Sequence, residues 1–402
     1  MVIISKKIVS AFLAFSLSAL AFSFETGGSL SNNTKFAGNK MDDLKLDQKN
    51  SAILWFRSPL TQDGAASFTA QGSFLTDFDD SVSESSDKLI LKADLDVFQF
   101  NLKKQFDSSS LDFTAGRFFN TDFTGLVFSQ AMDGAKVSYN GGLYTVSAYG
   151  AFTGLLNRKV VTILDSEVPE SVDSKEPYAL AKKYILAGAN FTLPAIFANQ
   201  TLALEGIGAF RLESQSYTRA YGSLSLSGPI VSSVFYKLSS TVGFATRYNT
   251  KARKAETTDD DDETSIGNLS KASITYYSTF KSLSLSANGI YASGKQGPFH
   301  AFQGFTSQTA VNSIESPEYS GIIKAGLGAT IKPVKSLLVK ASGDFVFNAK
   351  KDIEYAGIQY EGVIDWQIVS DLSIGANFGQ YFDNDNSDNN KTTIQLRAVI
   401  TF

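Results

Sequence analysis

Few residues in this sequence have the types and the spacing that catalysis or metal binding requires. The chain contains one histidine, His300, and no cysteine. A serine nucleophile with a histidine base would have to use that single imidazole. A zinc site of three or four histidine and cysteine ligands is excluded by the composition. The sequence therefore favours a protein that is not an enzyme and that needs no cofactor.

Two acidic stretches contain the oxygen ligands that calcium prefers. Residues 259–263 read Asp-Asp-Asp-Asp-Glu, and residues 383–388 read Asp-Asn-Asp-Asn-Ser-Asp. The second stretch lacks the glycine at position six and the acid at position twelve of a calcium loop, because Asp388 and Ile394 stand there. Such runs are typical of solvated loop tips. We interpret both as polar loops, with a calcium site in 259–263 as the alternative.

Most of the remaining charged residues alternate with apolar ones, which is the period of a β-strand. In residues 336–349, for example, Val339, Phe345 and Phe347 alternate with Lys340 and Asp344. The same pattern is found in residues 65–76, 231–248, 268–280, 317–332 and 354–369. In residues 88–104 the apolar positions change from odd to even after Val97, which predicts a β-bulge or, alternatively, two separate strands.

Connectors of two lengths separate these segments. Tight turns alternate with longer loops, which we place at about 32–48, 77–86, 119–130, 154–178, 249–267, 295–316 and 384–390. Short turns on one rim and long loops on the other are typical of transmembrane β-barrels. The pattern predicts about eighteen strands, with sixteen as the alternative.

The two ends of the chain indicate its compartment. Residues 1–23 have two lysines, an apolar run and small residues at a cleavage position, so we expect a signal peptide that is removed. Residues 24–402 then form the mature domain. The final segment, Lys391–Phe402, alternates to its last residue, with an apolar face that ends on Phe402.

Composition narrows the fold class. The chain is 43% hydrophobic and 12% aromatic, and no later stretch approaches the ~20 apolar residues of a spanning helix. A net charge of −4 offers no basic field for nucleic acid. Because every backbone group must be paired inside a bilayer, a membrane sheet has to close. We therefore predict an all-β, antiparallel up-and-down barrel without a plug domain, wide enough for an aqueous channel.

Two segments resemble a known family. The C-terminal strand is similar to that of outer-membrane barrels of diderm bacteria. The resemblance implies that Ile394, Leu396, Ile400 and Phe402 form a signal for the barrel assembly machinery. Residues 114–139, with Gly116-Arg117 and Gly125-Leu-Val-Phe128-Ser, resemble the constriction-loop region of porins and also barrel proteins of spirochaetes. The acidic-glycine motif of general porin loops is missing, so an ordinary surface loop held at its base by Arg117 is the alternative.

These observations predict a porin-like outer-membrane channel that small hydrophilic solutes cross by passive diffusion. Its partners would be membrane lipid, the assembly machinery and the solutes. The alternative is a surface adhesin that binds partners through its loops. We expect the polar face to line the pore through Lys92, Asp94, Arg117, Asp122, Asp133, Lys136, Lys237, Lys271, Lys324, Lys340, Asp344, Glu361, Asp365 and Arg397.

Overall fold

A computed structural model gives the structure of the protein. It describes residues 24–39, 43–79, 89–161, 163–164, 176–212, 217–247, 263–294, 301–306, 320–350 and 352–402. The expected signal peptide (1–23), His300 and the acidic residues 259–262 lie outside this part of the chain.

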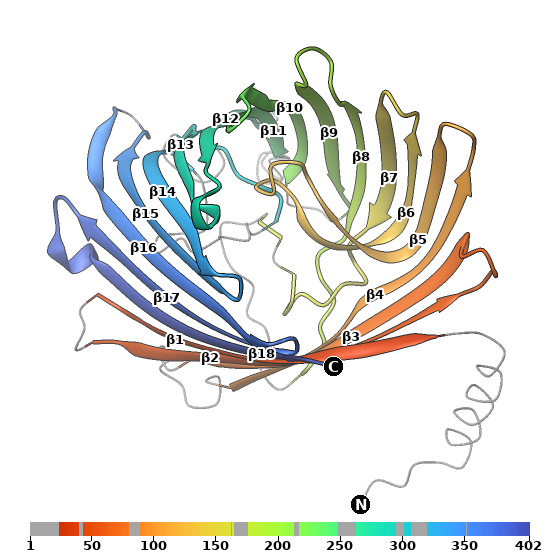
Figure 1. Ribbon diagram of the computed structural model, residues 1–402, viewed down its shortest axis with the longest axis horizontal. Helices are drawn as coiled ribbons and strands as arrows, with labels where there is room; N and C mark the ends of the chain where they lie inside the picture. The colour runs from red at the N-terminus through yellow and green to blue at the C-terminus, as the bar shows by residue number, and fades with distance from the viewer. Residues whose placement is uncertain are drawn as a thin grey trace, which may run out of the picture.

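The described residues form one closed antiparallel sheet of eighteen strands (Figure 1), which confirms the predicted barrel and strand number. Each strand pairs with its neighbours in sequence, and β18 closes the sheet against β1. The strands are β1 (Glu25–Gly38), β2 (Lys45–Pro59), β3 (Ala66–Asp79), β4 (Leu89–Gln105), β5 (Ser110–Thr121), β6 (Ser129–Asn140), β7 (Thr145–Phe152), β8 (Tyr184–Leu193), β9 (Thr201–Arg211), β10 (Tyr217–Val231), β11 (Val234–Arg247), β12 (Glu263–Tyr277), β13 (Ser284–Ala292), β14 (Ile322–Val334), β15 (Leu337–Asn348), β16 (Glu354–Val369), β17 (Leu372–Asp383) and β18 (Lys391–Thr401).

The described residues contain almost no helix. The named helices are two short 3-10 turns, η2 (Phe280–Ser282) and η4 (Ser387–Asn389). Within the described ranges, no helix is long and apolar enough to cross a bilayer.

The period-two pattern sorts the side chains to the two faces of the wall. Leu327, Ile364 and Trp366 point outward and are 70%, 49% and 47% exposed. Their polar neighbours in sequence, such as Glu361 and Asp365, line a hollow on the inner side of the wall. An exterior of exposed aliphatic and aromatic side chains is unfavourable in water and favourable in hydrocarbon.

The predicted bulge in residues 88–104 is present as one irregular position in a single strand. Gln71 of β3 pairs with Val97 of β4, and the next residue, Gly72, pairs with Leu95. Asp96 is therefore the extra residue, and it shifts the apolar face from odd to even positions. The alternative of two separate strands is wrong.

The loops follow the predicted layout with one correction. The longest connectors, 153–183, 248–262 and 293–321, each join an odd-numbered strand to the even-numbered strand that follows. Short turns such as 232–233, 335–336 and 370–371 lie at the opposite rim, and 212–216 and 349–353 are short connectors on the rim of the long ones. Residues 32–48, however, are not a long loop, because β1 continues to Gly38 and β2 begins at Lys45. The polar residues that suggested a loop belong to these two strands.

Candidate functional site: the lumen and an inward hairpin

The β5–β6 hairpin leaves the barrel wall partway along its length. β5 pairs with β4 from Ser110 to Arg117, and β6 pairs with β7 from Asp133 to Asn140. Between Arg117 and Asp133, on the side of the hairpin tip, the two strands pair only with each other. Their tip, residues 122–128, packs among inward-facing side chains of the wall. The segment 119–130 therefore turns into the barrel, as its resemblance to a constriction loop implied.

Arg117 lies at the point where the hairpin leaves the wall. Its guanidinium makes a bidentate ion pair with Asp133, at 2.8 and 2.9 Å, and a longer contact of 3.4 Å with Asp94. It also donates to the backbone oxygens of Leu95 (2.9 Å) and Leu155 (2.6 Å). Arg117 is 7% exposed. The planar fork of arginine suits such a site, because it satisfies several acceptors at once.

Gly116 explains why the strand carries a Gly-Arg pair. Its φ is +112°, and a Cβ at this position would lie 2.1 Å from the backbone oxygen of Phe98. A larger residue would separate β5 from β4 just below the departure point. The alternative of an ordinary surface loop is therefore wrong, because residues 122–128 pack inside the barrel. Its one correct element is that Arg117 holds the base of the hairpin.

Asp122 organises the hairpin tip. It is 2% exposed, and its carboxylate accepts hydrogen bonds from the backbone N–H groups of Thr124 (2.8 Å), Val127 (3.0 Å) and Phe128 (2.8 Å). These bonds satisfy amides in a turn that is removed from the sheet. Asp122 therefore shapes the hairpin, and Arg117 and Asp133 hold its base.

The tip is also fixed to the wall on the far side of the hairpin. Glu205 of β9 accepts from the backbone N–H of Phe123 at 3.0 Å, and Lys237 of β11 donates to the backbone oxygen of Phe123 at 3.2 Å. Lys136 of β6 donates to Asn120 at 2.9 Å. Two of the predicted pore-lining cations, Lys136 and Lys237, thus contact the hairpin directly.

A second long loop covers the hairpin. The backbone N–H of Phe305 donates to the oxygen of Val127 at 2.7 Å, and the ring of Phe305 lies 6.1 Å from Phe128 and 5.0 Å from Tyr184. Arg219 of β10 donates to the backbone oxygen of Gly304 at 2.9 Å. Residues 301–306 are therefore held between the hairpin and the wall.

This packing makes part of the inner wall apolar. Tyr184, Leu186, Ile207 and Ala209 face inward and are almost fully buried under the two loops. The sequence predicted a polar inner face on every strand. That prediction is wrong for β8 and β9. The inner face of these two strands packs against the hairpin and loop 301–306, and does not face the open lumen.

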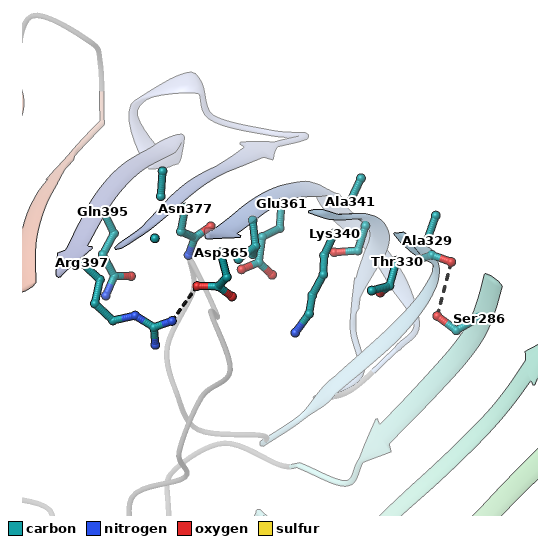
Figure 2. Close-up of a pocket in the computed structure, with 15 residues that line it drawn as sticks. Ser286, Ala329, Thr330, Lys340, Ala341, Glu361, Asp365, Asn377, Gln395 and Arg397 are labelled. Atoms are coloured by element: carbon teal, nitrogen blue, oxygen red, sulfur yellow. Dashed lines mark hydrogen bonds and ion pairs between the residues drawn. The ribbon is translucent and has the colours of Figure 1, made fainter. Parts of the chain in front are cut away.

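The opposite wall, β13–β18, is polar. A hollow of about 480 Å³ lies along it and is lined by residues of all six strands. Figure 2 shows the side chains that line this hollow. Its hydroxyl, amide and charged members are Ser286, Thr330, Lys340, Ser342, Glu361, Asp365, Asn377, Gln395 and Arg397. Arg397 bonds Asp365 at 2.6 Å, whereas Lys340 is exposed and makes no ion pair with any described residue. Four of the predicted pore-lining residues, Lys340, Glu361, Asp365 and Arg397, meet in this hollow.

The other predicted residues are distributed around the inner wall. Lys92 of β4 pairs with Asp77 at 2.9 Å. Lys324 of β14 is 7% exposed and donates to Gln359 at 3.4 Å, and Asp344 of β15 accepts from Asn288 at 3.3 Å. Lys271 of β12 is partly buried. Lys92 is thus paired with an opposite charge, and Lys324 and Asp344 each share a hydrogen bond with a neutral amide.

Sequence reasoning missed the segments that brace the hairpin. Asn157 is fully buried and donates to the backbone oxygens of Ala93 and Pro177, both at 3.0 Å. These bonds join the β7–β8 loop to the part of β4 that β5 no longer covers. The one available signal for residues 301–306 was two phenylalanines in a long loop, since an exposed loop rarely needs them.

The 383–388 stretch is a polar hairpin tip, as interpreted. Asp383 accepts from the backbone N–H groups of Asp385 (3.0 Å) and Asn386 (2.9 Å). Its carboxylate is thus occupied by its own turn. No cluster of three or more potential metal ligands occurs in the described segments.

Comparison with known proteins gives structural neighbours only. No protein-family model and no curated protein matches the sequence. Among solved structures, Pseudomonas aeruginosa OccK2 (OpdF) aligns with a TM-score of 0.61 at 13% identity, over 94% of this chain and 98% of that one. OpdQ aligns at 0.58 and 13%, over 94% and 98%, and the outer membrane protein opdK at 0.55 and 12%, over 94% and 99%, both from the same organism. The chain has a porin-like barrel fold.

Proposed function

We propose that this protein is a channel for passive diffusion of small hydrophilic solutes across the outer membrane of a diderm bacterium. The observation that carries the proposal is the division of the barrel interior. An inward hairpin and loop 301–306 fill one side, and a polar wall with a hollow lined by charged groups of both signs faces the other. Barrels of this strand number enclose an aqueous space.

The exterior supports the membrane location. A band of exposed apolar side chains surrounds the closed sheet, and closure removes the unpaired edges that hydrocarbon does not tolerate. Residues 1–23 would direct secretion as a cleaved signal peptide. The strand that ends on Phe402 would be read by the assembly machinery. The further resemblance to spirochaetal barrel proteins stays a prediction from Gly116-Arg117 and residues 125–129.

Solute choice would come from width and local charge. The wall hollow offers two cations and two acids, so we expect weak selectivity between anions and cations. The structure of OccK2 (OpdF) in complex with glucuronate shows that a neighbour of the same fold accommodates a small acidic sugar. In this chain, Lys340 is the cation best placed to meet such an anion, because it is exposed and unpaired among the described residues.

Conductance in planar bilayers tests the proposal. The purified protein should produce discrete, ohmic current steps. A heat-modifiable, bilayer-inserted protein that carries no current would contradict the channel. Binding of host matrix by such a silent protein would favour the adhesin alternative.

A further inference from the structure

The outward face of β1–β3 carries a group of polar side chains on a largely apolar exterior. Leu30, Leu54 and Phe74 mark this face and are 50%, 63% and 49% exposed. By strand alternation, the same face carries Asn32, Thr34, Gln48, Asn50 and Thr76. We call these five residues the amide patch.

The amide patch has apolar rows on both sides. Strand register aligns Asn32 with Asn50 and Asn50 with Thr76, directly beside the row formed by Leu30, Ala52 and Phe74. The apolar residues on the other side of the amide patch are Phe36, Leu46 and Phe78. An apolar band about 25 Å tall corresponds to roughly ten residues of a tilted strand, which is the span from Phe56 to Leu46 on β2. The patch therefore lies within the band that would face hydrocarbon.

The hydrogen-bonding capacity of the patch is only partly used. Asn32 Nδ2 donates to Asn50 Oδ1 at 2.7 Å, and Asn50 Nδ2 donates to Thr76 Oγ1 at 3.1 Å. Each of these amide nitrogens has a second hydrogen. Gln48 makes no side-chain hydrogen bond with any residue in the described ranges. Polar hydrogens left unpaired in hydrocarbon are costly.

A second outward polar cluster, on β11 and β12, shows the contrast. There Asn268 Nδ2 donates to Ser240 Oγ (3.0 Å) and to the backbone oxygen of Thr241 (3.2 Å), and Asn268 Oδ1 accepts from Ser270 (2.9 Å). Both amide hydrogens are used within the sheet. This cluster needs no partner, whereas the amide patch does.

We propose that the amide patch is the interface between two copies of this chain, related by a twofold axis along the membrane normal. Acyl chains offer neither donors nor acceptors, so the partner must present polar groups at the same depth. A primary amide carries both, which makes the patch complementary to itself, and a twofold contact closes as a dimer. Ala52 and Gly72, on the same face, would let the two walls approach closely. The inference rests on the proposed membrane location.

Disulfide trapping tests the interface, since the chain contains no cysteine. Ala52→Cys places a thiol beside the patch, and Ala272→Cys places one beside the saturated cluster on the far wall. After oxidation of intact outer membranes with copper phenanthroline, we expect Ala52→Cys to give a band at twice the monomer mass. Ala272→Cys should stay monomeric. Adding Asn32→Leu and Asn50→Leu to Ala52→Cys should lower the dimer yield at least fivefold.

Heat-modifiable gel mobility of each variant separates the two proposals. If Ala52→Cys is heat-modifiable and membrane-inserted but gives no dimer, the interface is wrong while the barrel stands. The interface is also wrong if Ala272→Cys cross-links equally well, if the asparagine variants cross-link undiminished, or if the adduct has the mass of a different protein. Wild-type protein without heat-modifiable mobility would contradict both the membrane location and the interface.

Discussion

Arg117 is the residue on which the inward course of the β5–β6 hairpin depends most. Replacing it by alanine leaves the carboxylates of Asp133 and Asp94 without their cation, and Asp94 is almost fully buried. Removing one partner of a buried pair costs about 3–5 kcal/mol. We expect Arg117→Ala to lower the free energy of unfolding by about that amount. The measurement is a denaturant titration of the protein in lipid vesicles, in which gel mobility reports the folded fraction.

Arg57→Ala is the matched control, because Arg57 is exposed on β2 and has no ion pair within the described residues. It should change stability by less than ~0.5 kcal/mol. Equal effects of the two substitutions would show that the Arg117 ion pairs do not hold the hairpin.

Lys340 is the best position at which to change the charge of the inner wall, because it is exposed and its replacement breaks no ion pair among the described residues. Lys340→Glu should move the reversal potential in a salt gradient toward cation preference, since it replaces an exposed cation in the hollow by an acid. Lys335→Glu, in the exposed 335–336 turn, makes the same change of net charge outside the lumen and should leave the potential nearly unchanged. A potential that responds to neither substitution would mean that Lys340 does not line the conducting path.

At the scale of elements, the backbone of loop 301–306 packs closely against the backbone of the β5–β6 hairpin. A Cβ on Gly304 would lie 2.7 Å from the backbone oxygen of Leu126. Gly304→Val should therefore push the loop away from the hairpin and widen the lumen. We expect a larger single-channel conductance or frequent transitions between levels. Gly222→Val is the control, because a Cβ there meets nothing within 4 Å. Identical conductance of the two variants would place loop 301–306 outside the constriction.

The strands were predictable from sequence, whereas the packing inside the barrel was predictable only in part. Alternation along 336–349 and 354–369 identifies strands because one face is apolar and the other polar. It failed at residues 32–48, where Asn32 and Asn50 make the outward face polar too. The contact between Phe305 and Phe128 joins segments far apart in the chain, and no local period encodes it. The apolar inner faces of β8 and β9 follow from that contact and were therefore missed.

At the scale of the whole molecule, the seam between β1 and β18 closes the barrel, and Phe402 extends the strand pairing there by one residue. Phe402 and Gly28 exchange two backbone hydrogen bonds, at 2.8 and 3.0 Å, across the seam between β18 and β1. Figure 1 shows the C-terminus beside these strands. If Phe402 is also an assembly signal, its deletion should reduce folded protein in cells far more than it reduces refolding in detergent. Equal losses in the two settings would mean that Phe402 acts only by closing the sheet.

A diffusion channel of this kind requires water inside the barrel and hydrocarbon outside it. Cysteine scanning of β16 measures this directly, with the protein reconstituted in lipid vesicles and a charged methanethiosulfonate reagent that enters water but not lipid. Val363→Cys and Asp365→Cys should react quickly, and Ile364→Cys and Trp366→Cys should react at least tenfold more slowly. Uniform reactivity along the strand, or faster reaction at the even positions, would contradict a water-filled channel.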